Sequence, residues 1–470
     1  MLQAESSPYI FSVLYDIIFQ APTYVIFLEL SLLLLVIWII IHKQSNGGKH
    51  LTQKQKEEII KNWVSEPLVA EIDENHPALQ NNHIVDGPIG KFINVDGIKC
   101  LNMATHNYLG LEEYPKIKEN AINCIHKYGV GSCGPRGFYG TVDVHLELEE
   151  RLAKFMDQEE AVVYSYAFST VASAIPAYCK RTDIIFADEC INFAIQKGID
   201  ASRSKVVYFK HNDMRDLEKK LQEQAKADQK NPKKAAKTRR FLIVEGIYMN
   251  TGEMCPLREL VELRAKYKLR LFLDETVSFG TIGKSGHGIT ELLCVDIKEV
   301  DLISASLENA VESIGGFCVG SHFIVEHQRL SGLGYCFSAS QPPLLTQAAI
   351  SALDIFEQEP RIFEQLNDVA EKVDEQFRYF TKLELKGHPL SPVKHLYLKH
   401  VDDLEESEKI LRKIADECMK KGLAVVAAEY LPIEKFPPKR SLRITVNRLL
   451  TADDISNAYK IIEEVSKSIA

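Results

Sequence analysis

A chain of 470 residues, 46% of them hydrophobic, is long enough to form one large and one smaller buried core. The net charge of −9 argues against nucleic acid as a partner, because binding to phosphates calls for a basic surface. Ten cysteines without a Cys-x-x-Cys pair, and no His cluster at metal spacing, indicate reduced thiols and no metal site rather than a disulfide scaffold.

The first strong pattern along the chain is an almost unbroken apolar run over Tyr24–Ile41, interrupted only by one glutamate and one serine. As a helix it would be about 27 Å long, enough to span the hydrocarbon core of a bilayer. Residues 1–42 contain no Lys or Arg, whereas Lys43 and further lysines follow the run closely. The positive-inside rule then predicts a single-pass anchor, with residues 1–23 lumenal and the main body cytoplasmic.

Two other interpretations of this run are weaker. A buried core helix is disfavoured because no soluble fold needs a helix that is apolar on every face. A cleavable signal peptide is disfavoured because no positively charged stretch precedes the run and no small-residue cleavage site follows it. Before the run, Tyr9–Phe19 predicts either an amphipathic helix on the lumenal surface or a weakly ordered apolar tail.

The residues after the run divide into a linker and two domains. Residues 42–83 are polar and charged, which predicts a linker with a lead-in helix from Lys54 to Trp63. Over residues 84–343, short β-branched or apolar runs alternate with helical stretches, as is typical of a mostly parallel sheet covered on both faces. A smaller α/β domain is expected over residues 344–470. The strands expected in the large domain are 161–165, 183–187, 205–209, 241–245, 269–273 and 301–304.

The smaller domain is expected to open with a helical stripe after Pro343 and to close with a helix that begins at a Thr451/Asp454 capping pair. Between them, Ser441–Val446 is predicted to be a strand. The Lys- and Gln-rich stretch over residues 219–240 predicts a solvated helix and loop, or alternatively a basic patch for anionic lipid or acyl-CoA phosphates.

The strongest indication of chemistry is a segment that has the pattern of a cofactor-binding lysine loop but contains no lysine. Asp274 ends a buried-looking strand, which is where α/β enzymes place working groups. In pyridoxal phosphate enzymes such a carboxylate pairs with the pyridine nitrogen, and a lysine some tens of residues later forms the Schiff base. The segment Asp301–Gly316 has the frame of that lysine loop, yet after Lys298 the next lysine is Lys372.

The run Tyr128–His145, which begins Tyr-Gly-Val-Gly-Ser-Cys-Gly-Pro-Arg-Gly, resembles the long-chain-base subunits of the α-oxoamine synthase family of pyridoxal phosphate enzymes. The likeness extends over nearly the whole chain, including the apolar run. It implies an α/β fold with a fold type I pyridoxal-phosphate-transferase-like large domain and a smaller C-terminal domain. It also implies an enzyme that condenses L-serine with palmitoyl-CoA to 3-ketosphinganine.

The resemblance also shows where this sequence departs from the family. Val277 stands in the place of a family histidine, Asn192 in the place of the ring-stacking histidine, and Asn309 in the place of the Schiff-base lysine. An asparagine has no amine that could form the aldimine, and its amide cannot stack on a pyridine ring as an imidazole does. The resemblance therefore implies a chain that is inactive alone, beside a second long-chain-base subunit that binds pyridoxal phosphate through its own lysine.

Fold type I enzymes build their sites between protomers, so an inactive chain can still furnish one wall of its partner's site. The resemblance implies that the Gly129–Gly140 loop lies near the partner's cofactor, with Cys133 and Arg136 as interface residues. It also implies a hydroxyl near the cofactor phosphate, for which Ser338 and Ser340 are the candidates.

Further candidates are weaker. Tyr164 is a candidate for the same interface wall, and Asp274 for a remaining contact with the cofactor. Arg443 resembles the family's carboxylate-binding arginine, and a structural salt bridge is the alternative. Besides the catalytic subunit, the resemblance implies a small activating subunit and ORM-type membrane regulators at the endoplasmic reticulum membrane.

Two other classes of function remain open at this point. One is a self-sufficient pyridoxal-phosphate-dependent acyltransferase or aminotransferase that uses Lys284 or Lys298. Neither lysine precedes a Gly-Gly pair at the family distance, which argues against it. The other is a purely structural membrane scaffold or regulator that contributes to no site.

Overall fold

The computed structural model describes residues 15, 22–45, 51–69, 83–401, 403–431 and 433–469, with side chains in the second of these ranges given as far as residue 41. The chain divides into two units, Met1–Asn82 and His83–Ala470. Most of the segment expected as a lumenal amphipathic helix, Tyr9–Phe19, lies outside the described residues.

The N-terminal unit contains the predicted apolar helix. Helix α2 (Thr23–Ser45) includes a stretch over Thr23–Ile41 that is long and apolar enough to cross a membrane and is not buried by the rest of the chain. Helix α3 (Gln53–Asn62) confirms the predicted lead-in helix within one residue at each end. It begins at a capping box in which Thr52 and Gln55 exchange hydrogen bonds.

The large sheet of the second unit has seven strands in the order β4-β10-β9-β8-β7-β5-β6. Strands β5 to β9 pair in parallel, whereas β10 is antiparallel to both of its neighbours. The mostly parallel sheet is confirmed, but β10 was not predicted. The strands are β4 (Glu160–Tyr164), β5 (Ile184–Asp188), β6 (Lys205–Phe209), β7 (Arg240–Glu245), β8 (Arg270–Asp274), β9 (Leu302–Ser306) and β10 (Gly316–Gly320).

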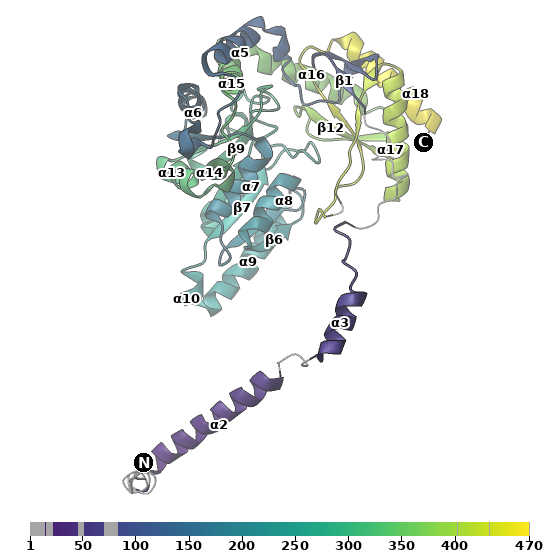
Figure 1. Ribbon diagram of the computed structural model, residues 1–470. Coiled ribbons are helices and arrows are strands. Elements are labelled where there is room, and N and C mark those ends of the chain that lie inside the picture. Colours follow the sequence, from purple (N-terminus) through teal and green to yellow (C-terminus); the bar gives the residue numbers. More distant parts are fainter. Residues whose placement is uncertain are drawn as a thin grey trace. The chain divides into compact units, whose positions relative to one another are not determined.

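The central strands are buried along their whole length, as in β5 and β9, because helices cover both faces of a parallel sheet. Helices α7 and α8 pack on each other beside this sheet (Figure 1). The helices before the C-terminal region are η1 (Leu111–Glu113), α5 (Pro115–Tyr128), η2 (Arg136–Gly140), α6 (Asp143–Phe155), α7 (Ala167–Tyr178), α8 (Phe193–Ser202), α9 (Met214–Lys230), α10 (Pro232–Ala235), α11 (Leu257–Tyr267), α12 (Ile289–Leu292), η3 (Ile297–Glu299), α13 (His322–Ser331) and α14 (Leu333–Phe337).

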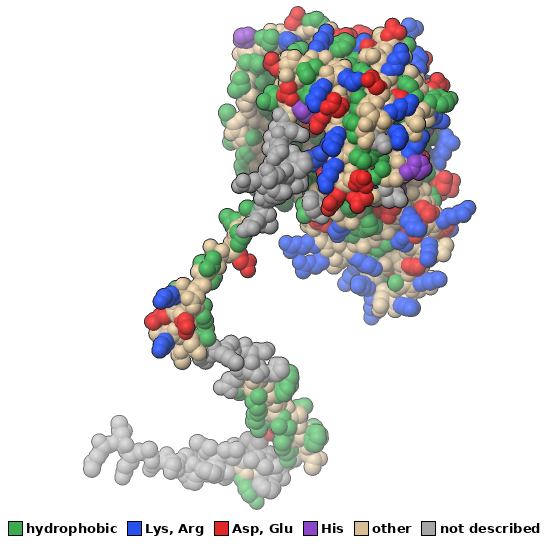
Figure 2. Space-filling view, turned by 90° about the vertical axis from the view of Figure 1, so that its right-hand side faces the viewer, with side chains coloured by type: hydrophobic (Ala, Val, Ile, Leu, Met, Phe, Trp, Pro, Cys, Tyr) green, Lys and Arg blue, Asp and Glu red, His purple; other side chains and the backbone are tan. Residues whose placement is uncertain are grey.

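The Lys- and Gln-rich stretch forms most of α9 and the short α10. Within α9 only Leu217 and Leu221 are buried, which agrees with a solvated helix. Figure 2 shows Lys and Arg side chains gathered at the lower end of the body, where α9 and α10 lie in Figure 1.

Two small sheets contain strands from the C-terminal part of the chain. One has the order β11-β12-β15-β14, and the other has the order β1-β2-β3-β13. In the second sheet, β3 pairs in parallel with β13, so residues near 101 lie beside residues near 423. The strands are β1 (Val85–Asp86), β2 (Phe92–Val95), β3 (Ile98–Asn102), β11 (Leu383–Lys386), β12 (Val393–Leu398), β13 (Leu423–Ala424), β14 (Val426–Ala427) and β15 (Leu442–Thr445).

The C-terminal helices are α15 (Pro343–Gln358), α16 (Arg361–Phe377), α17 (Leu404–Lys420) and α18 (Ala452–Ile469). The start of α18 confirms the predicted capping pair: the Thr451 N-H donates to the Asp454 carboxylate at 2.8 Å, and the Asp454 N-H donates back to the Thr451 hydroxyl at 3.3 Å. Strands β1 to β3, which the sequence assigned to the large domain, pair with the C-terminal part instead. The boundary at residue 343 stays a prediction.

Candidate functional site

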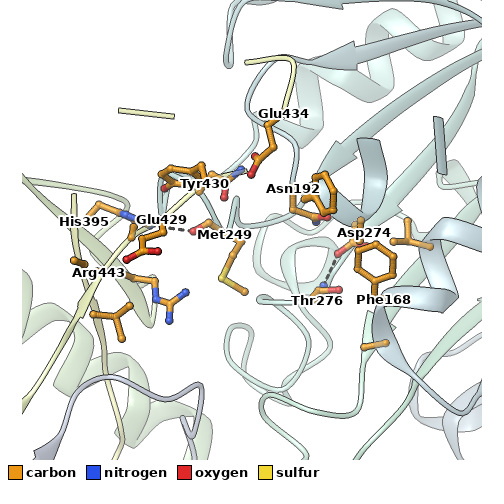
Figure 3. Close-up of a pocket in the computed structure, with 18 residues that line it drawn as sticks. Phe168, Asn192, Met249, Asp274, Thr276, His395, Glu429, Tyr430, Glu434 and Arg443 are labelled. Carbon is orange, nitrogen blue, oxygen red and sulfur yellow. Dashed lines mark hydrogen bonds between the residues drawn. The ribbon is translucent and has the colours of Figure 1, made fainter. Parts of the chain in front are cut away.

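A cavity of about 620 Å³ lies between the carboxyl ends of the parallel strands and the sheet that contains β12, β14 and β15. Asp274, at the end of β8, and Thr276 lie on one side of it, whereas His395 and Arg443 lie on the other (Figure 3). The strand-end position predicted for Asp274 therefore faces a cavity that could hold a small molecule.

Asp274 is fully enclosed and already hydrogen-bonded. One carboxylate oxygen accepts from the Thr276 N-H and the other from the Ser304 hydroxyl, both at 2.9 Å. Burial raises the pKa of this carboxyl. The register of β7 and β8 places Glu245 directly beside Asp274, and burial together with the Asp274 charge raises the pKa of Glu245 to about 8. Two acidic groups thus lie side by side, and one of them, Asp274, lines the cavity.

Asn309, which the sequence analysis assigns to the place of the family's lysine, is 8% exposed and does not line the cavity. Its side-chain amide donates to the Thr276 carbonyl at 3.0 Å, which ties the loop after β9 to the loop after β8. Asn192 is also committed to the fold: its side-chain oxygen accepts from the Ile195 N-H at 3.0 Å and caps α8. Val277, in the place of the other family histidine, is buried in the core.

These residues do not fit a covalently held pyridoxal phosphate. No lysine is among the described residues that line the cavity. The Asn192 side chain is engaged as a helix cap, and the Asp274 oxygens each have a donor from the chain itself. The cavity keeps the shape of a ligand site without the amine that a Schiff base needs.

Arg443 reaches into the cavity from β15 (Figure 3). Among the residues that the structure describes it has no carboxylate partner, so the alternative of a structural salt bridge is not found. One terminal nitrogen donates to the Ala104 carbonyl at 3.5 Å, and burial lowers the pKa of the guanidinium. His395, nearby on β12, is bonded to Ser441 and to the Met249 carbonyl, and burial lowers its pKa to about 4. It is therefore neutral at physiological pH.

The Gly129–Gly140 loop and Tyr335–Pro343, the segment of Ser338 and Ser340 that the sequence also offers as an interface wall, lie against each other, away from this cavity. The Ser340 N-H and hydroxyl both donate to the Gly134 carbonyl, at 2.9 and 3.0 Å, and the Ser132 hydroxyl donates to the Ser340 carbonyl at 2.9 Å. A Cβ on Gly140 would lie 1.9 Å from the Gly134 oxygen, so only glycine fits there. Cys133 is exposed within this loop and has a positive φ of 58°.

The remaining predicted interface residues differ in exposure. Arg136 is buried and forms a bidentate pair with Glu149, at 2.9 and 3.0 Å, so it stabilises the loop and has no free charge to offer a ligand. Tyr164 is 1% exposed and its hydroxyl donates to the Gln328 side chain at 2.9 Å. Ser338 is partly exposed at the end of α14. None of Cys133, Arg136, Tyr164 and Ser338 lines the cavity of this chain.

Large apolar side chains are exposed on the same two stretches. Helix α14 lies against η2, which is part of the Gly129–Gly140 loop, so these side chains form one group. We call it the α14 patch. Such a group of exposed apolar residues is typical of a protein interface. The α14 patch consists of Val130, Phe138, Tyr139, Leu333 and Phe337, which are 64% to 104% exposed.

A group that the sequence analysis missed lies at the carboxyl end of β5. Asp188, Cys190 and His211 bring ligand atoms within 4.8 Å of one another, the kind of set that could hold a metal ion. Asp188 already accepts from the Cys190 and Asn212 N-H groups and from the His211 ring. These bonds give the group a structural role. His211 follows Cys190 by 21 residues, so the sequence shows no short spacing of the kind that marks a metal site.

Comparisons with known proteins agree with the family resemblance of the sequence. Residues 98–462 match the family model for aminotransferase class I and II. The chain is 39% identical over 430 residues to serine palmitoyltransferase 1 of Dictyostelium discoideum, covering 89% of this chain and 88% of that protein. It is 41% identical over 426 residues to long chain base biosynthesis protein 1b of Oryza sativa, covering 90% and 87%.

Solved structures show the same fold. A structure of SPT with a PLP internal aldimine superimposes with a TM-score of 0.73 at 22% identity, covering 83% of this chain and 93% of that one. Serine palmitoyltransferase of Sphingomonas wittichii gives the same TM-score and identity over 82% and 92%.

Proposed function

The chain belongs to the family of serine palmitoyltransferase 1 and long-chain-base 1 subunits within the class I and II aminotransferases, and we propose from this that it is the non-catalytic but required subunit. It is a subunit of serine palmitoyltransferase in sphingolipid long-chain-base synthesis. The proposed reaction is the condensation of L-serine with palmitoyl-CoA to 3-ketosphinganine. Its site is completed by a second, catalytic subunit, whose lysine holds the pyridoxal phosphate.

The observation that carries this proposal is the position of Asn309. It occupies the family's lysine place and donates to the Thr276 carbonyl, next to the strand end that carries Asp274. Lys284 and Lys298, the alternatives for a self-sufficient enzyme, are exposed and do not line the cavity. Because no described residue that lines the cavity carries an amine, the chain is expected to be unable to form the covalent intermediate on its own.

The proposed contribution of this chain is a wall at the interface. The Gly129–Gly140 loop holds its shape through Ser340 and through the buried Arg136–Glu149 pair, while Cys133 and the α14 patch stay exposed to a partner. Ser338, on the same surface, would meet the cofactor phosphate of the catalytic subunit. This exposed surface favours an assembling subunit over a scaffold that contributes to no site.

Reduction with borohydride tests the proposal. The purified full-length chain is incubated with pyridoxal phosphate, reduced, and analysed by peptide mass spectrometry, with the assembled heterodimer as the positive control. We expect no absorbance near about 420 nm for the chain alone and, in the heterodimer, label only on the catalytic subunit. Label on Lys284 or Lys298 would favour the self-sufficient enzyme instead.

The proposed location is the endoplasmic reticulum membrane, with α2 as a single anchor and the N-terminus in the lumen. Helix α2 is apolar over Thr23–Ile41, and the lysines follow it rather than precede it. A glycosylation acceptor added before residue 1 should be modified, and one added after Ala470 should not. The reverse pattern would invert the topology. We place the small activating subunit and ORM-type regulators around this helix.

A further inference from the structure

A second cavity lies at the opposite end of the parallel sheet from the candidate site. Its volume is about 370 Å³, and it lies where strands β7, β8 and β9 begin, next to the start of helix α13. Phe241, Phe272 and Leu302 form part of its walls. None of its described lining residues is shared with the cavity beside Asp274, so a molecule bound here would leave the candidate site free.

The interior of this second cavity is suited to a hydrocarbon chain. The Tyr178 hydroxyl is turned to the protein and donates to the Ile324 carbonyl at 2.6 Å. One ring nitrogen of His327 donates to the Ala177 carbonyl at 3.0 Å. At the surface the cavity is bordered by Phe323, which is 82% exposed. A cavity of this size with apolar and aromatic walls is typical of a small-molecule site.

Two arginines supply positive charge beside these apolar walls. Arg270 donates to Asp301 at 2.7 Å through one terminal nitrogen, and Arg239 pairs with Asp183 at 2.7 Å while its guanidinium lies 5.7 Å from the centre of the Phe241 ring. Within the described ranges, Nε and Nη2 of Arg270 and Nη1 of Arg239 have no hydrogen-bond partner. Both arginines therefore keep donors for an anion at the entrance of the cavity.

We propose that this cavity binds a single-chain amphiphile with an anionic head group. The hydrocarbon chain would fill the apolar interior, and a carboxylate or phosphate head would bind the guanidinium groups of Arg239 and Arg270, which match both anions in geometry. Each methylene that enters the cavity should raise the affinity about fourfold. The inference goes beyond the proposed function and does not depend on which subunit holds the cofactor.

Photolabelling tests this proposal. The full-length chain, in discs of phosphatidylcholine, is irradiated with a decanoate that carries a diazirine at the end of its chain, and labelled peptides are identified by mass spectrometry. We expect label in residues 270–272, 302 and 321–324. Decanoate and decyl phosphate should both reduce this label, and the more potent of the two identifies the preferred head group. Decyltrimethylammonium and decanol, at the same free concentration, should compete at least about tenfold more weakly.

Two variants assign the site. Ser321 lines the cavity and its hydroxyl makes no cap hydrogen bond to α13, so Ser321→Trp should fill the cavity and lower the label at least about tenfold. Arg270→Gln should raise the half-maximal probe concentration about tenfold, because the anion loses one guanidinium. Asp301 keeps its ion pair with Arg264, so this variant should retain the fold. Arg361→Gln, at an exposed position outside the cavity, is the matched control.

Three measurements make the outcome decisive. Label on residues 22–41 reports probe dissolved in the disc and should be equal in all variants. Thermal melting accompanies each labelling, and one variant that melts like the wild type is sufficient for the assignment. The chain assembled with the catalytic subunit is labelled in parallel and should keep the label in the cavity.

The inference is overturned if the cavity of the wild-type chain is not labelled or if both variants are labelled normally. It is also overturned if decyltrimethylammonium competes as well as decanoate, because the head group would then not be recognised by the arginines. Loss of label in the assembled enzyme would show that the partner covers the cavity, which excludes a ligand site there.

Discussion

Arg136 and Glu149 set the shape of the interface loop at the scale of single residues. Glu149 is buried and accepts from Arg136, from Arg329 and from the Val163 N-H. One carboxylate therefore connects the Gly129–Gly140 loop to strand β4 and to helix α13. A buried charge pair contributes little over an apolar substitute, but the loss of one member leaves the other uncompensated.

This arrangement predicts unequal costs for the two partners. Glu149→Ala leaves the buried Arg136 guanidinium without its carboxylate, although Arg329 keeps Glu160, and should lower the free energy of unfolding by about 3–5 kcal/mol. Arg136→Ala leaves Glu149 paired with Arg329 and should cost less, about 1–3 kcal/mol. Urea unfolding of the full chain measures both, with Lys420→Ala, in an exposed ion pair with Glu417, as the control. Equal costs would mean that Arg329 does not share the charge.

A substitution at Cys133 distinguishes an interface role of the Gly129–Gly140 loop from a structural one. It is exposed with a positive φ, so Cys133→Trp should change the unfolding free energy by no more than about 0.5 kcal/mol. If the loop forms a wall of the partner's site, turnover per assembled heterodimer should fall about tenfold or more, or selectivity between serine and alanine should change. Cys294, also exposed with a positive φ of 51°, provides the matched Cys294→Trp control. Unchanged turnover and selectivity would exclude the loop from the site.

Glu312 should make stability depend on pH. Burial, and then the Glu112 charge, raises the pKa of Glu312 to about 8, while one of its oxygens accepts from the Leu111 N-H at 2.8 Å. An acid whose folded-state pKa is raised binds more protons when folded, so its contribution is complete below about pH 4.5 and is lost as the pH rises through 8.

Glu312→Gln keeps the acceptor and removes the titration. We expect it to raise the free energy of unfolding by about 1–2 kcal/mol at pH 8 and to change it little at pH 5. Denaturant titrations at the two pH values measure this, with Glu417→Gln on an exposed ion pair as the control. A variant that is destabilised equally at both pH values would show that the carboxylate is charged in the fold.

At the scale of elements, the fold was predicted better than the site, because alternating strands and helices and a capping pair are visible in the sequence. Strands β4 to β9 and the start of α18 were found because apolar runs and a Thr/Asp pair are local signals. Strand β10 was missed because its Gly316 and Gly320 ends weaken the strand signal. Glu245 and Glu434 were missed for another reason: the pairing of β7 with β8 places Glu245 beside Asp274, and the segment between β14 and β15 brings Glu434 to the cavity.

Helix α2 and the body should be separable. Deletion of residues 1–45 removes the described helix that is long and apolar enough to span a membrane, whereas the cores of the second unit lie entirely after residue 82. We expect the shortened chain, expressed without its partner, to be released by alkaline carbonate and to keep its circular dichroism spectrum. The full chain is the control and should stay with the membrane. A shortened chain that stays membrane-bound would reveal a second attachment.

At the scale of the whole molecule, the α14 patch should decide assembly. Phe337 is 72% exposed, so Phe337→Glu should leave the fold of this chain intact but weaken its association with the catalytic subunit by about 2 kcal/mol or more, roughly 30-fold. Phe323, 82% exposed on α13 and outside the patch, provides the control Phe323→Glu, which should assemble normally. Size-exclusion chromatography of co-expressed subunits measures both. Normal assembly of Phe337→Glu would place the interface elsewhere.

The parallel pairing of β3 with β13 means that the small sheet cannot be completed until late in the synthesis of the chain. The two strands are separated by roughly 300 residues of chain, so at a synthesis rate of about 5–20 residues per second β3 waits for its neighbour for some 15–60 seconds. During that interval α2 has already left the ribosome and can engage the membrane, while one edge of the β1–β3 sheet is open to other chains. If α2 is the anchor we propose, it engages the membrane before the chain is complete, and we expect a molecular chaperone to cover that edge until residue 424 emerges.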